Sequence, residues 1–229
     1  MIFKDLAMII AAGGSGSRFS KTQNKLLAEY RGKKLLLYSL ETFLPVLPEK
    51  ALIAAAPADL LDEMRTVVDN ALPGNNIQWT VGGATRVASV ANALKLVPPE
   101  CRMVAIHDAA RPLATVELLQ ELYQAAAEFG GAIPGTAPVD TVKDIDNNGL
   151  ICKNLIRSNL AMVSTPQVFR LDEYRKSLEA LPGEVISGQR EEKLLTDDAA
   201  FFTGAGFKVK VIISEQPNPK ITYARDAVQ

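Results

Sequence analysis

Short apolar runs of strand length alternate with amphipathic stretches along most of this chain, and this alternation restricts its fold more than any other feature. The runs lie at residues 6–12, 51–57, 76–83, 102–110 and 131–137. Between them, residues 34–43, 57–70, 86–96 and 115–129 carry apolar residues three to four positions apart, the spacing of one helix face. Two runs, MIIAA and LIAAA, are apolar throughout, as strands buried on both faces require. The sequence therefore predicts an α/β fold, a mostly parallel sheet with helices on both faces.

The alternation stops after residue 138. Thr141–Ile145 and Leu150–Ile156 are strand-like and are joined by Asp-Asn-Asn-Gly, a composition that suits the positive φ angles of a tight turn. A two-stranded hairpin is only marginally stable alone in water. We therefore expect residues 138–160 to form a protruding β-arm that lies against a second subunit, with a solvated hairpin as the alternative.

The α/β pattern resumes beyond the arm with helices at 171–181 and from Thr196, and with a strand at 207–213. We expect one domain over residues 1–229, because a chain of this length with 48% hydrophobic residues can bury one sizeable core.

Charge and composition limit the partners that this chain is expected to bind and the cellular compartment in which it is expected. A net charge of −1 offers no broad basic field, so neither nucleic acid nor a membrane surface is expected as a partner. The apolar runs are too short to span a bilayer and no secretory signal is indicated, which makes a cytoplasmic location the expectation. Cys101 and Cys152 have no Cys or His neighbours at ligand spacing, so we expect reduced thiols and no zinc site.

The segment AAGGSGSRF, residues 11–19, follows the first apolar run and has the composition of a phosphate-binding loop. It is not a Walker A loop, because no Gly-Lys-Ser/Thr follows, and Phe19 stands where the dinucleotide fingerprint needs a small residue. Arg18 and Lys25 supply positive charge close by. Loop amides with a guanidinium and an ammonium suit a phosphate chain, and a structural turn is the alternative.

Seven segments, in order along nearly the whole chain, resemble the motifs of the 2-C-methyl-D-erythritol 4-phosphate cytidylyltransferases. They are the glycine loop with Arg18 and Lys25, GGATRVASV (82–90), HDAARP (107–112), DTVK (140–143), Arg157 with STPQVF (164–169), TDDAA (196–200) and NPKIT (218–222). The resemblance implies a single Rossmann-like sheet with a dimerisation arm, and a homodimer with shared active sites.

The resemblance also implies a reaction, in which a phosphate oxygen of a sugar alcohol attacks the α-phosphorus of CTP and pyrophosphate leaves. It assigns catalytic roles to Arg18, Lys25, Thr141, Arg157 and Lys220. It assigns CTP binding to Ala12, Gly13, Gly14, Gly16, Gly83, Ala84, Ser89, Asp108 and Ala109. Asp108 ends an apolar run at what would be the ligand-binding edge of the sheet, where a carboxylate suits the Mg²⁺ that accompanies CTP.

Three further residues have a structural and a chemical interpretation. We expect His107, the only histidine, to make hydrogen bonds at a strand end and not to act as an acid or base. We expect Arg86 to play a structural role at the start of its helix. The TDD segment is typical of a helix start capped by Thr196 or Asp197, and a second metal-ligand role for Asp198 is the alternative.

The chain departs from the family at Asn24, Leu26 and Pro219, where the usual motifs read Pro-Lys-Gln and Asn-Ile-Lys. Two other functions stay open for this reason: a cytidylyltransferase acting on ribitol 5-phosphate or another polyol phosphate, and a nucleotide-binding regulatory paralogue with weak activity. Ala110 favours the methylerythritol phosphate enzyme, since the ribitol enzymes tend to carry a bulkier residue there. A dehydrogenase is the least favoured.

Overall fold

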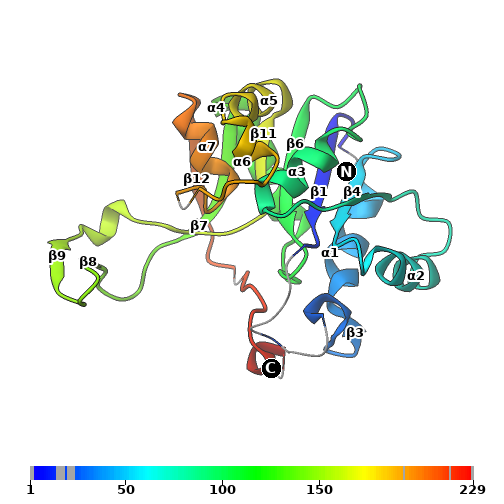
Figure 1. Ribbon diagram of the computed structural model, residues 1–229, viewed down its shortest axis with the longest axis horizontal. Coiled ribbons are helices and arrows are strands. Elements are labelled where there is room, and N and C mark those ends of the chain that lie inside the picture. Colours follow the sequence, from blue (N-terminus) through cyan, green and yellow to red (C-terminus); the bar gives the residue numbers. More distant parts are fainter. Residues whose placement is uncertain (1–2, 14–18, 20–23, 193, 217, 228–229) are drawn as a thin grey trace.

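The computed structural model describes residues 3–13, 19, 24–192, 194–216 and 218–227, without the side chains of Ala224 and Ala227. One eight-stranded sheet forms its centre, with seven strands in the order β10-β7-β11-β6-β1-β4-β5 and β12 paired with β7 (Figure 1). These strands are β1 (Leu6–Ala11), β4 (Leu52–Ala56), β5 (Gln78–Val81), β6 (Met103–Asp108), β7 (Gly131–Thr136), β10 (Met162–Val163), β11 (Gln167–Arg170) and β12 (Val209–Ile213).

The first half of the sheet is parallel, as predicted. β1 lies between β4 and β6, with Ala11 opposite both Ala55 and Asp108, and β4 pairs with β5. The residues of β1, β4 and β6 are almost all fully buried, because helices cover both faces. Since parallel strands end at the same edge, the loops after Ala11, Val81 and Asp108 meet at the carboxyl edge of the sheet.

Strand β11 was not predicted, and it runs antiparallel between β6 and β7 near the middle of the sheet. It has only four residues, so no periodic pattern marks it. β10 pairs with the far end of β7 at Gly135 and Thr136, and Ser164–Pro166 separate β10 from β11. This interruption places Thr165 beside the end of β6, where its hydroxyl accepts a hydrogen bond from the amide of Asp108 at 3.0 Å.

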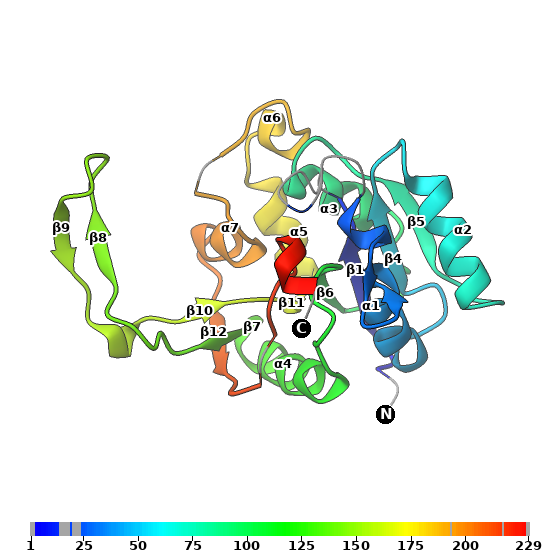
Figure 2. The same ribbon diagram turned by 90° about the horizontal axis from the view of Figure 1, so that it is seen from below.

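Helices cover the two faces of the sheet unequally. α3 packs on β1, β4 and β5, and α4 packs on β7, β11 and β12 from the opposite face, where Figure 2 shows it apart from α3 and α5–α7. The helices are α1 (Leu35–Phe43), α2 (Leu61–Ala71), α3 (Arg86–Leu94), α4 (Val116–Phe129), α5 (Leu171–Glu179), α6 (Gly183–Ile186) and α7 (Asp198–Gly204). Among the described residues, no helix combines the length and the apolar character needed to cross a membrane.

Capping side chains define where several helices begin. The side-chain oxygens of Thr85, Thr115 and Asp197 accept backbone N–H groups in the first turns of α3, α4 and α7. Of the two capping residues proposed for the TDD segment, Asp197 is therefore the one that the structure uses. Each such cap contributes about 1 kcal/mol and fixes the direction in which the chain enters the helix.

Residues 138–160 contain an antiparallel hairpin that projects from the body of the molecule in both views (Figures 1 and 2). Its strands are β8 (Lys143–Ile145) and β9 (Ile151–Asn154), shorter than predicted, and every residue in them is exposed. Asp146 accepts hydrogen bonds from the amides of Asn148 and Leu150, and Gly149 has φ of +81°. The local turn chemistry therefore forms the hairpin without help from the core.

A second small hairpin, which was not predicted, follows the glycine loop. It consists of β2 (Glu29–Tyr30) and β3 (Lys33–Lys34) and packs beside α1, where the Tyr38 hydroxyl donates to the Tyr30 carbonyl at 2.6 Å. Its strands have two residues each, below the length at which alternation can be recognised. The other regular elements of the described residues are the short 3₁₀ turns η1 (Lys25–Leu27), η2 (Leu44–Val46), η3 (Arg157–Asn159) and η4 (Ala224–Ala227).

Candidate active site at the carboxyl edge of the sheet

Backbone hydrogen bonds join the loops at the carboxyl edge to one another. The amide of Ala12 donates to the Ala55 carbonyl at 2.9 Å, and the amide of Ala109 donates to the Ala11 carbonyl at 3.3 Å. The amide of Gly82 donates to the Ala56 carbonyl at 2.8 Å. Three segments therefore start from one rigid edge of the sheet: the first part of the glycine loop, the turn before α3 and the HDAARP segment.

The turn at Gly83 is held by Ser89. The Ser89 hydroxyl accepts the Gly83 amide at 3.0 Å and donates to the Thr85 carbonyl at 2.8 Å. A Cβ on Gly83 would lie 2.4 Å from Ala88 Cβ, so only glycine fits this turn. Ser89 Oγ also lies 3.8 Å from the place of a Cβ on Gly13. The structure thus brings Gly13 and Gly83, two of the residues predicted to read the base, next to Ser89, which stabilises the turn at Gly83.

Within the part of the chain that the structure describes, three cations surround the carboxylate of Asp108. Lys220 Nζ lies 2.9 Å from Oδ2, Arg111 Nε lies 3.4 Å from Oδ2, and Arg86 Nε lies 3.6 Å from Oδ1. Burial opposes ionisation of Asp108, but Lys220, Arg86 and Arg111 outweigh it and hold its pKa well below the usual range. The cluster keeps an excess of positive charge, which suits a ligand with several phosphate groups.

His107 is fully buried one residue before Asp108. Its Nε2 lies 3.1 Å from Ser39 Oγ and 3.3 Å from the Arg111 carbonyl, and its Nδ1 lies 3.2 Å from Thr165 Oγ1. Desolvation lowers the His107 pKa to about 4, so the ring is neutral at neutral pH. The predicted hydrogen-bonding role at a strand end is confirmed.

The segment Asn218–Thr222, which we call the C-terminal strap, crosses the carboxyl edge. Arg111 Nη1 donates to the Asn218 carbonyl at 2.8 Å, and Asn218 Nδ2 donates to the Thr165 carbonyl at 2.7 Å. The Ile221 amide donates to the Ala110 carbonyl at 2.9 Å, and Lys25 Nζ donates to the Ile221 carbonyl at 3.2 Å. The strap therefore brings Lys220 to Asp108 and connects it to Lys25.

The departures from the family motif beside Lys25 have a local structural role. Asn24 caps the 3₁₀ turn η1 by accepting the Leu26 amide at 2.9 Å, and Leu26 and Leu27 are buried in the core. The lysine is thus fixed by a capping side chain on one side and by two buried leucines on the other.

The structure does not bring every predicted residue to this edge. Thr141 and Arg157 are exposed near the base of the arm, where Arg157 Nη1 donates to the Val139 carbonyl at 2.6 Å, and the arm projects away from the central sheet (Figure 2). Gly14, Gly16 and Arg18 lie outside the described residues. The Asp198 oxygens are bound by the Tyr174 hydroxyl and by Arg86, so this carboxylate is engaged in contacts within the protein.

Sequence reasoning missed three side chains that build the site. Arg111 stands inside HDAARP and Asn218 inside NPKIT, so both were within segments already identified, but neither was assigned a role. Thr165 stands inside STPQVF and was likewise assigned no role, because its contacts with His107 and Asp108 exist only once β11 pairs with β6. Arg86 was expected to be structural, and its ion pair with Asp198 agrees, yet its Nε also faces Asp108.

The protein offers few metal-binding side chains at this edge, which suits a metal ion that is held mainly by the phosphates of a bound substrate. Among the described residues, no three His, Cys, Asp or Glu side chains gather closely enough to hold a metal ion. Asp108 offers one ionised carboxylate, whose Oδ2 is already occupied by Lys220 and Arg111. Mg²⁺ in phosphate-transferring sites commonly takes one or two carboxylates together with substrate phosphates. The arrangement fits that mode, and Asp108 is the residue of this cluster that would hold such an ion, through a carboxylate that also faces Lys220, Arg111 and Arg86.

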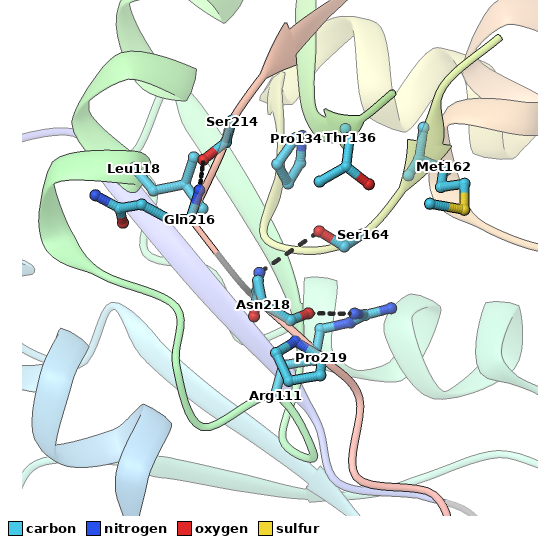
Figure 3. Close-up of a pocket in the computed structure, with 12 residues that line it drawn as sticks. Arg111, Leu118, Pro134, Thr136, Met162, Ser164, Ser214, Gln216, Asn218 and Pro219 are labelled. Carbon is cyan, nitrogen blue, oxygen red and sulfur yellow. Dashed lines mark hydrogen bonds between the residues drawn. The ribbon is translucent and has the colours of Figure 1, made fainter. Parts of the chain in front are cut away.

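A cavity of about 340 Å³ lies beside this cluster (Figure 3). Arg111, Asn218 and Ser164 form its polar side, and Asn218 is shown there bonded to Ser164 and to Arg111. Ends of β7 and β10 form the opposite wall through Pro134, Thr136 and Met162. The edge therefore has room for a small polar molecule next to the cationic cluster.

Comparison with known proteins gives one consistent result. The family model of 2-C-methyl-D-erythritol 4-phosphate cytidylyltransferase (IspD) matches residues 6–229. The chain is 34% identical over 223 residues to the protein of that name from Microcystis aeruginosa, covering 96% of this chain and 94% of that protein.

Solved structures agree with this result. The fold matches the 4-diphosphocytidyl-2C-methyl-D-erythritol synthase of Anaerococcus prevotii with a TM-score of 0.80 at 28% identity, covering 98% of this chain and 93% of the other. It matches the 2-C-methyl-D-erythritol 4-phosphate cytidylyltransferase of Thermus thermophilus with a TM-score of 0.72 at 26% identity, covering 98% and 96%. The sequence match, the shared fold and the motif residues gathered around Asp108 agree that this chain belongs to the 2-C-methyl-D-erythritol 4-phosphate cytidylyltransferase family.

Proposed function

We propose that this chain transfers the cytidylyl group of CTP to 2-C-methyl-D-erythritol 4-phosphate, which forms a CDP-alcohol for isoprenoid synthesis and releases pyrophosphate. The observation that carries the proposal is the cluster of Lys220, Arg111 and Arg86 around Asp108 at the carboxyl edge of the sheet. Two polyanions must approach each other in this reaction, and a rigid cationic site lowers the cost of that approach.

The reaction needs no protein nucleophile. An oxygen of the acceptor phosphate forms a new bond to the α-phosphorus of CTP, and the bond from that phosphorus to the bridging oxygen of the β-phosphate breaks. The acceptor oxygen is already anionic, so no proton has to be removed from it. This agrees with a neutral, buried His107 at the site and leaves positioning and charge stabilisation as the sources of catalysis.

Lys25 and Arg18 are the residues we propose for stabilising the transferring phosphorus and the departing pyrophosphate. Support for Lys25 comes from its ammonium, which donates to the Ile221 carbonyl next to Lys220. Support for Arg18 comes from the sequence motif alone. Removing one preorganised donor of this kind typically costs about 10²- to 10³-fold in turnover.

CTP would lie across the loops after β1, β5 and β6. We assign the cytosine to the backbone of Ala12, Gly13, Gly83 and Ala84, and the phosphates to the amides from Gly13 to Gly16. Asp108 and Ala109 would lie beside the ribose and phosphates. Asp108 would hold a magnesium ion that accompanies CTP, and the ion would supply charge neutralisation during the transfer.

We further propose that the arm completes the acceptor site of a second copy of the chain. Its exposed apolar side chains support this, with Val139 at 81%, Leu150 at 66% and Ile156 at 67% exposure. Surfaces of this kind on a projecting hairpin favour burial against a partner. Thr141 and Arg157 would then reach the acceptor phosphate bound by Lys220 of the partner chain.

The decisive experiment measures pyrophosphate release from CTP and Mg²⁺, with methylerythritol 4-phosphate and ribitol 5-phosphate offered separately. Release with the first acceptor alone is the expected result. Release with ribitol 5-phosphate alone would reassign the acceptor and keep the cytidylyl transfer. Nucleotide binding without release from either acceptor would refute the catalytic proposal and favour a regulatory nucleotide-binding protein.

A further inference from the structure

A line of polar groups runs from the core of the protein to Asp108. The Tyr174 hydroxyl donates to Asp198 Oδ1 at 2.6 Å, and Asp198 Oδ2 forms an ion pair with Arg86 Nη1. Arg86 Nε then lies 3.6 Å from Asp108 Oδ1. Tyr174 on α5 and Asp198 at the start of α7 are both fully buried, and neither has a part in the reaction described above.

The Asp198 carboxylate is held in one orientation by its surroundings. Gln167 Oε1 accepts the amides of Asp198 and Ala199 at 3.2 and 3.1 Å, and Gln167 Nε2 donates to Asp197 Oδ2 at 2.9 Å. These bonds tie the start of α7 to β11, the strand next to β6. The carboxylate therefore points at Arg86 from a rigid frame.

Stability alone is a poor explanation for this arrangement. Buried ion pairs often contribute no more to stability than well-packed apolar residues of similar volume, because both charges lose their hydration. Their best-attested use is to impose one specific arrangement. Here the arrangement they impose is the orientation of a planar guanidinium that faces the most highly charged point of the site.

Arg86 also has an unused donor. Among the described residues, its Nη2 is buried and has no hydrogen-bond partner, while Nη1 is held by Asp198 and Nε faces Asp108. Because the group is planar and two of its nitrogens are fixed, the direction of Nη2 is fixed as well. Arg86 is the first residue of α3, directly after the turn at Gly83 and Ala84. The two contacts that fix Nη2 are thus the same ones that orient Arg86 toward Asp108.

We propose that Asp198 and Tyr174 are positioning residues for nucleotidyl transfer, which act through Arg86 to fix the charge arrangement at Asp108. This inference rests on the proposed function. Tyr174 suits the role because burial and the nearby Asp198 carboxylate raise its pKa well above the usual value, so it remains a donor. Arg86 remains charged, since Asp198 and Asp108 outweigh the effect of burial on its pKa.

The first test compares Asp198→Asn and Tyr174→Phe with Ser177→Ala. Ser177 is fully buried on the same helix as Tyr174 and donates to the Tyr174 carbonyl, but it has no contact with the carboxylate, so it is a matched control. We expect kcat/KM for CTP to fall about 10- to 100-fold in Asp198→Asn and several-fold in Tyr174→Phe, the usual range for partners that orient an active-site group. Ser177→Ala should stay within about twofold of wild type.

The second test asks whether Tyr174 acts through Arg86. In an Arg86→Gln background, Tyr174→Phe should change kcat/KM by less than about twofold, because the group it orients is gone. A purely structural role would lower activity equally in both backgrounds, and that result would overturn the proposal. This pair of variants also keeps the test decisive if Asp198→Asn does not fold.

The experiments distinguish a failure of the proposed function from a failure of the positioning role. If the wild-type chain releases no pyrophosphate with CTP and either acceptor, the proposed function is refuted and the positioning role falls with it. If wild type is active and both Asp198→Asn and Tyr174→Phe match it while melting at the same temperature, only the positioning role is refuted.

Discussion

Lys220 Nζ donates to Asp108 Oδ2 at 2.9 Å and so joins two residues that are 112 positions apart in the chain. The contact connects the end of β6 to the C-terminal strap that follows β12. Asp108 is largely buried, with its side chain 12% exposed, whereas the Lys220 side chain is 40% exposed. The ammonium is thus held by the site while much of the lysine side chain stays exposed.

Replacing Lys220 with methionine should lower kcat/KM for the acceptor about 10²-fold, because a charged donor aimed at the reacting phosphates is lost while the apolar stem is kept. Pyrophosphate release at varied acceptor concentration measures the effect. Lys208→Met is the control, since Lys208 is an exposed lysine in the turn before β12, away from Asp108, and it should behave as wild type. Equal activity of the two variants would remove Lys220 from the site.

Stability should fall as the pH is lowered below neutrality, because of His107. Burial lowers its pKa to about 4 in the folded protein, whereas in the unfolded chain the ring binds a proton at a pKa of about 6.5. Between these values the unfolded state holds more protons, so the free energy of unfolding decreases with falling pH by about 1 kcal/mol per unit. Urea unfolding at several pH values checks this, and the slope should be shallower in His107→Gln.

The neutral state of His107 also predicts how kcat depends on pH. Since the ring stays neutral down to a pKa of about 4 and no proton is taken from the acceptor, kcat should show no inflection from His107 near its ordinary pKa. A pH profile of kcat in wild type and in His107→Gln tests this. An inflection near the ordinary histidine pKa that disappears in the variant would make His107 an acid or base after all.

Gly83→Ala should weaken CTP binding and should destabilise the folded protein to a smaller extent. A Cβ there would lie 2.4 Å from Ala88 Cβ, so the turn before α3 must move, at a cost of about 1–3 kcal/mol. We expect a higher KM for CTP and a lower melting temperature. Gly204→Ala at the end of α7 is the matched control, because a Cβ there meets nothing within 4 Å. An unchanged KM for CTP in Gly83→Ala would remove this turn from the nucleotide site.

Mixing two inactive variants tests whether sites are shared between chains. Arg157→Ala damages the arm and Lys220→Ala damages the body, so a mixed dimer would have one site with both lesions and one intact site. Random reassociation of equal amounts should then restore about a quarter of wild-type activity, since half of the dimers are mixed. Absence of any recovery, with exchange of chains verified by labelled subunits, would place both residues in one chain's own site.

The sequence by itself determined the elements that arise from local chemistry. The buried strands β1, β4 and β6 are apolar without interruption, and the Asp146–Gly149 turn carries the residues that positive φ angles require. The motifs also located the charged groups Lys25, Asp108 and Lys220. Each of these signals lies within about ten neighbouring residues, which is why a pattern can reveal it.

Only the tertiary structure decided which of these groups meet. Thr165 reaches His107 and Asp108 because β11 inserts antiparallel next to β6, and Lys220 reaches Asp108 because the C-terminal strap crosses the carboxyl edge. The contacts that run from Tyr174 through Asp198 to Arg86 likewise join three helices that no local sequence pattern relates. Contacts between such distant residues depend on strand order and packing, and these follow from burial of the whole core and not from any one segment.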